Sequence, residues 1–437
     1  MKRLTEERVS PLSACCAAFR VRSGGVGAAR RAIQHAFASP PCQIDARDRS
    51  RRRRSGGRAL AAVALSLSVL VAGCSSGDDD GDKRDAAKDT PAHLDSDWSV
   101  SAALAEVPRS ATGDRVFVQT GDLAAAAEAA GVERTDGGDV RDWLLPVTGV
   151  GREGKTSQVF VPLADLINPT RVGDDQLKTV LGFDLDAVDS FVEQSAPPSD
   201  LVVVAGPDLS PDRLSDDLTD QGGVLTDLGG EDLAIDLKRV KDALSPISQP
   251  TRIRAEAGAV ALSSTTPAVK AWRGDGETLA DDESLAAVAS ALDDAGVYSA
   301  VVTEASSSND PAAKALGPNV TAEQLEKMKA QIEPSIPPEP YDAVGIGWAI
   351  EDGEARVHLA YHFADDDAAA SGLEALEQAW GEGTAVQSWR PMSDYVTVVD
   401  SATDGAVATI TLSMVDQRAP VVVLNFLVQQ EPVFVSR

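Results

Sequence analysis

The chain has 437 residues, which is enough for two or three domains of ordinary size. Its formal net charge of −28 is unevenly divided along the chain. Residues 1–74 carry 14 Lys and Arg and 4 Asp and Glu. The residues after Cys74 therefore carry 26 Lys and Arg and 64 Asp and Glu, a net charge of −38. So acidic a surface repels phosphate backbones and anionic headgroups, and the composition therefore argues against a protein that binds nucleic acid.

The four cysteines all lie within the first 74 residues, as Cys15, Cys16, Cys42 and Cys74. A chain that begins at Cys74 holds a single cysteine, which excludes an internal disulfide and a cysteine-ligated metal. The stability of such a chain depends on packing.

Residues 1–50 are basic and contain no clear helix or strand pattern. A mis-assigned start codon, with the true start further downstream, explains them best. An unusually long positive region before an export signal is the alternative.

Residues 51–73 have the three parts of a secretory signal peptide. Arginines at positions 51–54 and 58 precede an apolar stretch over residues 59–71, and small residues follow. The apolar stretch is too short for a membrane span, which takes about 20 residues. The sequence therefore predicts export, with the general secretory and twin-arginine routes both left open.

Val71, Ala72, Gly73 and Cys74 resemble a bacterial lipobox. The resemblance covers only residues 51–77 and implies that signal peptidase recognises Val71, Ala72 and Gly73, that the bond before Cys74 is cut, and that Cys74 is diacylated. Rich in alanine, aspartate and glycine and poor in lysine, the chain is similar in composition to actinobacterial-type lipoproteins. The implied location is the outer face of the cell membrane, held there by covalent lipid.

The segment 74–96 is polar and acidic and shows no apolar periodicity, so we expect a flexible tether after the lipidated cysteine. Asp78, Asp80 and Asp82 alternate as in a calcium-binding loop. The glycine and the distal glutamate of an EF-hand are missing, which favours a solvated linker.

Further along the chain, strands and helices are predicted by alternation, by apolar runs and by capping residues. A strand at 115–119 leads into an alanine-rich helix at 123–130, and a strand at 201–205 leads into a helix that opens at Ser210 and Pro211 and ends near Gly222. Hairpins are expected at 224–235, 252–263, 343–363 and 395–413, helices at 281–295, 321–333 and 365–380, and a buried helix or strand at 421–428.

These repeated strand-turn-helix and hairpin units predict an α+β fold, mostly of antiparallel sheet with helices packed on one face. A run of serine, asparagine and proline interrupts the pattern between residues 306 and 340. We therefore expect an α+β domain at 97–305, a linker with one helix at 306–340 and a smaller α+β domain at 341–437.

Residues 149–156 match the Walker A pattern, with Gly149, Gly154, Lys155 and Thr156 at the required positions. Phosphate binding requires a helix to begin at the Lys-Thr pair. The residues that follow, 157–162, are β-branched and aromatic and end in proline, which indicates a strand paired with residues 143–147 across a hairpin loop. The sequence therefore argues against nucleotide binding.

His358 and His362 could share a metal on a helix, where residues four apart are neighbours. Alternating apolar residues at 357, 359, 361 and 363 indicate a strand instead, and four residues along a strand span about 13 Å. A single metal cannot easily join them, because zinc–nitrogen bonds are only about 2 Å long. We expect a polar or interfacial sheet face.

Asp184, Asp186 and Asp189 form a second acidic cluster. A cation site is one interpretation, and a helix capped by Asp186, with Val188 and Val192 on its apolar face, is the one we favour. The six tryptophans, at positions 98, 143, 272, 348, 380 and 389, are expected in the core, with a sugar-binding surface at Trp380 and Trp389 as the alternative.

The sequence predicts no catalytic residue, metal site or cofactor, because the mature part lacks cysteine beyond Cys74, has three histidines and shows no known nucleophile motif. The leading hypothesis is a non-catalytic, lipid-anchored surface or interaction module with an envelope protein as partner. A lipoprotein that binds an apolar or sugar ligand is the alternative. A secreted hydrolase is third, and a cleft with converging carboxylates or a cluster centred on His358 would favour it.

Overall fold

The computed structural model describes residues 93–94, 97–113, 115–134, 139–151, 156–164, 167–168, 174–197, 199–239, 244–245, 248–307 and 321–437. All of these belong to one compact unit, Arg84–Arg437. The signal peptide, the lipobox with Cys74, and Lys155 lie outside the described residues, so the predictions made for them stay predictions.

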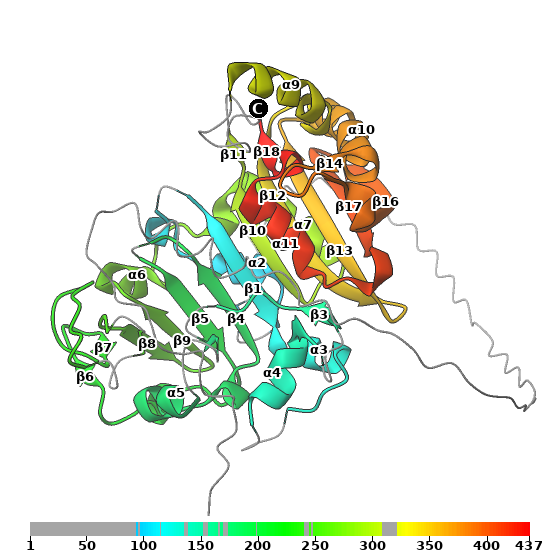
Figure 1. The fold of residues 1–437 in the computed structure, drawn as a ribbon. Coiled ribbons are helices and arrows are strands. Elements are labelled where there is room, and N and C mark those ends of the chain that lie inside the picture. Colours follow the sequence, from blue (N-terminus) through cyan, green and yellow to red (C-terminus); the bar gives the residue numbers. More distant parts are fainter. Residues whose placement is uncertain are drawn as a thin grey trace, which may run out of the picture. The chain divides into compact units, whose positions relative to one another are not determined.

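The described residues contain a twelve-stranded antiparallel sheet (Figure 1). Its strands, from one edge to the other, are β16 (Val396–Asp404), β17 (Val407–Met414), β13 (Glu354–Phe363), β12 (Tyr341–Glu351), β10 (Ser299–Glu304), β1 (Phe117–Asp122), β4 (Ser190–Gln194), β5 (Leu201–Ala205), β9 (Ala259–Ser263), β8 (Arg252–Glu256), β7 (Leu225–Thr226) and β6 (Thr219–Asp220). The segments 97–305 and 341–437 share this sheet, because Ser299 of β10 lies opposite Trp348 of β12.

Helices cover both faces of the sheet, not one face as predicted, although the α+β class is confirmed. One face packs against α2 (Val100–Ala105), α6 (Thr266–Ala271) and α7 (Glu283–Asp294), and the other against α3 (Leu123–Ala129), α4 (Arg141–Val147), α5 (Asp174–Leu181), α10 (Asp366–Glu382) and α11 (Val421–Gln429). Strand β4 shows why, since Phe191 and Val192 are both fully buried but enter opposite cores. Strands that are buried on both faces need two helical layers.

Several predicted elements are confirmed because their signals are local. The β8–β9 hairpin and β5 have the predicted bounds, and the long hairpin β12–β13 turns at Asp352 and Gly353, both in the left-handed region. Helix α7 begins where the Asp282 side chain accepts a hydrogen bond from the Leu285 amide, and α10 begins where Asp365 accepts one from Ala368. The predicted helix at 321–333 is α9 (Ala322–Ile332), and 421–428 is helical.

Several local predictions are wrong. Residues 143–147 belong to helix α4, whose buried Trp143, Leu144 and Val147 have helical spacing. The helix expected after Ser210 is a single 3-10 turn, Pro211–Arg213. The hairpin expected at 224–235 does not form, because Leu225 pairs with Ile253 of β8. Each error comes from short segments whose partner lies elsewhere in the chain.

No helix in the described part of the chain has both the length and the apolar character that crossing a membrane requires.

Replacing Gly372 in α10 with alanine is expected to destabilise the fold by about 1–3 kcal/mol, because overpacking a core has that cost. An added Cβ would lie 2.3 Å from Cζ of the buried Phe363. Gly381, in the same helix, has nothing within 4 Å of its added Cβ. Gly381→Ala should therefore raise stability by up to about 1 kcal/mol through helix propensity. Urea denaturation of both variants tests the pair. If the free energy of unfolding changed in the same direction in both, the result would contradict this packing of α10.

Candidate functional site

An open groove with a volume of about 740 Å³ lies between helix α7 and strands β13, β17 and β16. Ala287, Ala291 and Asp294 of α7 form one wall. Among the described residues that line the groove there is no lysine or arginine. Its size falls within the range of about 300–1,000 Å³ that is usual for small-molecule sites.

The register of the sheet arranges the floor of the groove in rows. His358 on β13 lies opposite Thr411 on β17, which lies opposite Asp400 on β16. Val407, four residues before Thr411 on β17, lies opposite Asp404 on β16. Since side chains four residues apart on a strand share a face, the two aspartates lie on the same side of β16 and are separated by about 13 Å along it.

Two glycines in β12 let α7 approach the sheet and so form the wall of the groove. A Cβ at Gly345 would lie 2.5 Å from Cγ1 of Val288, and one at Gly347 would lie 3.0 Å from Cδ2 of Leu292. Gly347 is also paired with His358 on the neighbouring strand. The close approach of the helix therefore depends on the two residues of β12 that lack side chains.

His358 is 9% exposed, and its two ring nitrogens have different surroundings. Nδ1 lies 3.2 Å from the Thr411 hydroxyl, within hydrogen-bonding distance. Nε2 lies 3.0 Å from Oε1 of Glu351, but this contact does not have hydrogen-bond alignment, and Nε2 is a buried atom without an aligned partner. In the tautomer that carries its proton on Nε2, the ring donates toward the Glu351 carboxylate and Nδ1 accepts from the Thr411 hydroxyl.

Burial lowers the pKa of His358 below its ordinary value of 6.5. Glu351 opposes this shift through its charge, whereas the nearby Arg356 reinforces it. Arg356 also lies 3.7 Å from Glu351 and 3.0 Å from Glu354, so it is shared between two carboxylates. The ring is therefore neutral at pH 7, and the carboxylates determine the sign of the charge in the groove.

His358 is expected to lower the free energy of unfolding at low pH. Because its pKa is lowered in the folded chain, the unfolded chain takes up the proton first as the pH falls below about 6.5. Its contribution is therefore complete above that pH and is lost below it, with a slope of at most about 1.4 kcal/mol per pH unit. When the free energy of unfolding is measured by denaturation between pH 7.5 and pH 5, it should change less with pH for His358→Gln than for the wild type. Parallel profiles would contradict the burial of a neutral ring.

His358 and His362 lie on a strand, as predicted, and do not converge. Nδ1 of His362 lies 3.6 Å from Oδ2 of Asp342, away from the row that contains His358 and Thr411. The described residues contain no group of three or more His, Cys, Asp and Glu side chains placed to hold a metal ion.

The strands on either side of the Walker-type loop pair antiparallel, as in a hairpin, but the predicted partner, residues 143–147, is wrong. Thr148 of β2 (Thr148–Val150) lies opposite Phe160 of β3 (Thr156–Phe160). Thr156 begins a strand, whereas a phosphate-binding loop would need a helix at this position. The loop between the two strands, residues 152–155, lies outside the described residues.

The aspartates at positions 184, 186 and 189 have structural partners, although the helix predicted after Asp186 does not form. Residues Leu185–Ala187 are one 3-10 turn before β4. Asp186 accepts a hydrogen bond from Trp143 Nε1 at 2.9 Å, and Asp189 accepts one from Arg134 at 2.7 Å. These contacts join the turn to α4, so the cluster supports packing.

Four of the six tryptophans are in the core, namely Trp143, Trp272, Trp348 and Trp380. Trp98 is half-buried, and Trp389 is 48% exposed. A sugar-binding surface formed by Trp380 and Trp389 together is therefore excluded, because Trp380 packs inside against Phe426 and Phe434.

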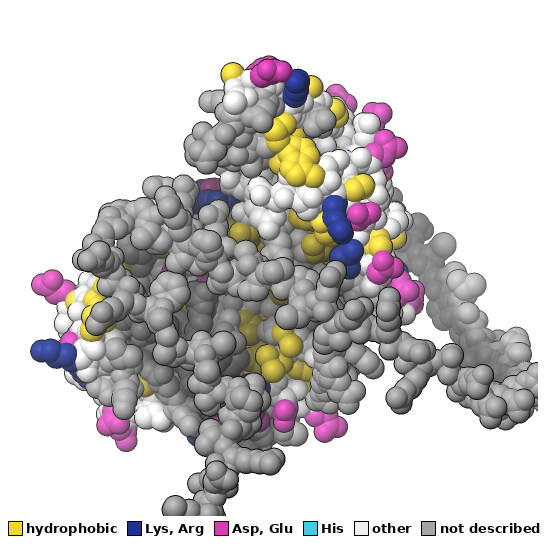
Figure 2. Space-filling model, viewed as in Figure 1, with side chains coloured by type: hydrophobic (Ala, Val, Ile, Leu, Met, Phe, Trp, Pro, Cys, Tyr) yellow, Lys and Arg dark blue, Asp and Glu magenta, His cyan; other side chains and the backbone are white. Residues whose placement is uncertain are grey.

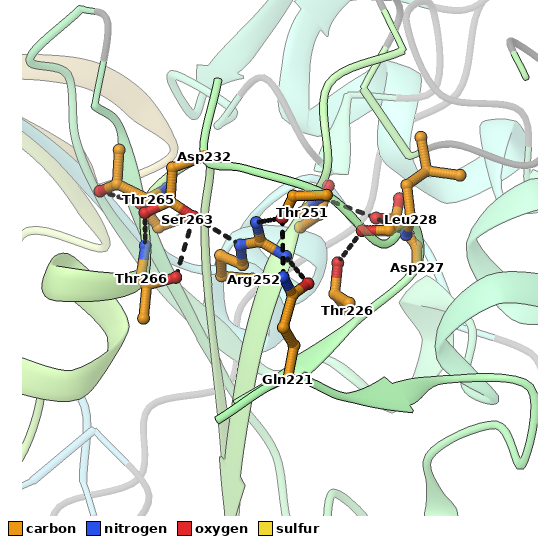
Figure 3. Close-up of polar contacts among 11 residues, drawn as sticks. Gln221, Thr226, Asp227, Leu228, Asp232, Thr251, Arg252, Ser263, Thr265 and Thr266 are labelled. Atoms are coloured by element: carbon orange, nitrogen blue, oxygen red, sulfur yellow. Dashed lines mark hydrogen bonds and ion pairs between the residues drawn. The ribbon is translucent and has the colours of Figure 1, made fainter. Parts of the chain in front are cut away.

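Figure 3 shows a second polar cluster around Arg252, on the part of the sheet that includes β8. Its buried guanidinium donates to Asp232 at 2.7 Å, to Gln221 at 3.1 Å and to the carbonyl of Gly230 at 2.7 Å. Asp232 also accepts two hydrogen bonds from Thr266. Burial opposes ionisation of Asp232, but these bonds together lower its pKa.

The neighbouring Asp227 accepts hydrogen bonds from the amides of Leu228, Leu244 and Thr251, each at 2.9 Å or less. Its pKa is nevertheless raised, because burial outweighs these bonds. Within the Arg252 cluster and around Asp227, the polar groups contact one another and the backbone of the loop (Figure 3). We therefore assign both clusters a structural role, which is to hold the chain between β7 and β8 in place.

Acidic side chains are spread over the face shown in Figure 2, with Lys and Arg between them in places. Surface acidity by itself therefore does not mark a site. The groove differs because its carboxylates surround a cavity and a buried imidazole. Sequence analysis identified His358 but missed Asp294, Glu351, Asp400 and Asp404; the Gly345 and Gly347 pair in β12 was the available signal of a close helix.

No family model matches the chain, and no curated protein matches it. Two chains of solved structures do. One is crystal form I of TP0453, a Treponema lipoprotein, with 8% identity and a TM-score of 0.29 over 74% of this chain and 97% of that chain. At this level of similarity the comparison carries no inference about function.

Proposed function

We propose that this protein is a lipid-anchored, extracytoplasmic binding protein that holds a small ligand in the groove between α7 and β13, β17 and β16. The observation that carries the proposal is the groove itself, with a volume of about 740 Å³, alanines of α7 on one wall and Asp, Glu, His, Ser and Thr side chains among its lining residues. A concave site of this size is typical of small-molecule binding. It favours ligand binding over the pure interaction module.

The location on the membrane rests on the lipobox-like residues Val71, Ala72, Gly73 and Cys74 and on the basic and apolar segment before them. We propose that lipid on Cys74 holds the chain on the outer face of the cell membrane. The folded body begins close behind, since Leu94 is already buried in the core that contains α2. The groove then lies outside the cell, where small ligands from the medium or the envelope reach it.

We propose binding without catalysis, although a hydroxyl, an imidazole and a carboxylate stand in line at Thr411, His358 and Glu351. Acyl transfer needs free N–H donors to stabilise an oxyanion beside the nucleophile. Thr411 lies in β17, which is paired on both sides with β13 and β16. The backbone amides around its hydroxyl are therefore engaged in the sheet.

Native mass spectrometry of the protein extracted gently from membranes tests the binding proposal. We expect a releasable mass beyond the lipidated chain. Ala291→Arg, which extends a cationic side chain into the groove, should lose this mass. Ala129→Arg, on the exposed side of α3, is the matched control and should retain it. If the wild type and Ala291→Arg released the same mass, the ligand would not lie in the groove, and the proposal would be contradicted.

A further inference from the structure

We infer that the loop between β7 and β8 makes a second contact with the membrane, by inserting Ile235 and Leu237 among the phospholipids. Lys238 and Arg239 then lie at the level of the phosphates. The inference rests on the lipid anchor proposed at Cys74 and is independent of the groove. It is carried by the exposure of these side chains and by the side of the body on which the tether joins it.

Two large aliphatic side chains of this loop are exposed to solvent. Ile235 is 57% exposed and Leu237 is 73% exposed, the highest value for a large hydrophobic side chain in the described part of the chain. Lys238 and Arg239 follow them directly and are also exposed. Apolar side chains beside basic ones match a bilayer surface, where acyl chains lie beneath phosphates.

The loop is held in position at its base. Asp232 accepts hydrogen bonds from the buried Arg252 and from the amide and hydroxyl of Thr266, the first residue of α6 (Figure 3). Leu233, the next residue, has a φ of 63°, a conformation that is unfavourable for a bulky side chain. Backbone strain of this kind persists where the surrounding contacts impose it. The base therefore positions the exposed part of the loop beside the start of α6.

The tether joins the body on the same side as this loop. The described chain begins at His93, whose Nδ1 lies 3.0 Å from Glu106. Glu106 in turn accepts a hydrogen bond from Arg273, two residues beyond the end of α6. The loop is attached at one end of α6 and the tether near the other, and a helix of six residues is only about 9 Å long. Helix α11, which carries the exposed Val428, packs on the opposite face of the sheet.

The length of the tether favours contact through this side of the body. A flexible tether between Cys74 and His93, as the sequence predicts, has an end-to-end distance of about 25 Å. The radius of gyration of a body of this length is about 20 Å. The side that carries His93 is therefore held near the bilayer, whereas the opposite side would need the tether to reach around the body. The acidic surface elsewhere opposes the contact only weakly, because salt screens exposed charges beyond about 8 Å.

An environment-sensitive nitrobenzoxadiazole label tests the inference. Cys74 is the last cysteine of the chain and is acylated in the lipoprotein, so Leu237→Cys takes the label at one position. The lipidated, labelled chain is placed in vesicles of phosphatidylcholine and phosphatidylglycerol in equal parts, with a doxyl-labelled lipid as quencher. We expect lipid quenching at position 237. Val428→Cys, which is 60% exposed on α11, is the matched control and should show none.

Substitutions in the labelled chain separate the two parts of the contact. Ile235→Ser should lower the ratio of inserted to free label about tenfold, since burial of one large aliphatic side chain contributes this much. Val150→Ser, at a position that is 53% exposed on β2, should leave the ratio unchanged. Lys238→Glu should also lower it, because a carboxylate would then face the phosphates.

A label at position 237 that stays in water, in vesicles that hold no other protein, would overturn the inference. So would equal or stronger quenching at position 428, or equal effects of Ile235→Ser and Val150→Ser. Intact mass of the same sample measures lipidation separately. An unlipidated chain would contradict the anchor and this inference together, whereas a lipidated chain with an unquenched label at position 237 would overturn the loop contact alone.

Discussion

Replacing Glu106 with alanine is expected to lower the free energy of unfolding by about 3–5 kcal/mol, the usual cost of removing one partner from a buried ion pair. Glu106 follows α2 and is 1% exposed. Its carboxylate accepts hydrogen bonds from Trp272 Nε1 at 2.5 Å and from Arg273 Nη2 at 2.8 Å. Without it, the buried indole N–H and much of the guanidinium lose their acceptor.

The effect should be large because several features depend on this one carboxylate. Arg273 has a φ of 50°, in the left-handed region that is unfavourable for residues other than glycine, and its guanidinium lies 4.9 Å from the centre of the Trp272 ring. His93 Nδ1 lies 3.0 Å from the same carboxylate. The carboxylate therefore joins the beginning of the described body to the segment after α6.

Urea denaturation of Glu106→Ala measures this loss. Glu277→Ala, at an exposed position in the loop that follows Arg273, is the matched control and should change stability by less than about 0.5 kcal/mol. In a double-mutant cycle, Trp272→Phe should cost less in the Glu106→Ala background than in the wild type, because the indole N–H has already lost its acceptor. A loss below 1 kcal/mol for Glu106→Ala would contradict this account of the cluster.

Replacing Cys74 with serine is expected to abolish lipidation and the cleavage that depends on it. The thiolate is the nucleophile in cysteine chemistry, and a serine hydroxyl does not replace it. Each buried methylene of an acyl chain contributes about 0.8 kcal/mol to membrane binding, so loss of two chains removes the anchor. Intact mass should show a wild-type chain that begins at Cys74 with acyl groups, and an uncut variant without them.

The uncut variant also distinguishes the two explanations of residues 1–50. A mass that includes Met1 would indicate a long positive region before the signal, and a shorter mass would indicate a start further downstream. Cys42→Ser, which lies before the signal, is the control and should not alter the mature mass. A wild-type chain that is unlipidated and retains residues before Cys74 would contradict the predicted anchor.

Local sequence patterns determined much of the fold. The β8–β9 hairpin follows from alternation on either side of Ala257 and Gly258, and α7 and α10 follow from aspartates that cap their first turns. These signals lie within about a dozen residues of the elements they specify, so neighbouring residues are sufficient to predict them. The export signal is of the same kind, because charge, apolar length and small residues are all read in one short segment.

Only the tertiary structure decided how these pieces combine. Residues 97–305 and 341–437 share one sheet because β10 pairs with β12, and α4 is helical because Trp143 and Leu144 pack into the core beside Asp186. Short segments such as 225–226 have no preference strong enough to choose a partner, and long-range pairing chooses for them.

The groove is also a product of tertiary structure. Asp294, His358 and Asp400 come from a helix and two strands that are separated by dozens of residues, and the register of β13, β17 and β16 brings them together. Sequence alone determined that His358 lies on a strand and has a polar role. Which carboxylates face it depends on strand order, and strand order is set by burial of both sheet faces across the whole domain.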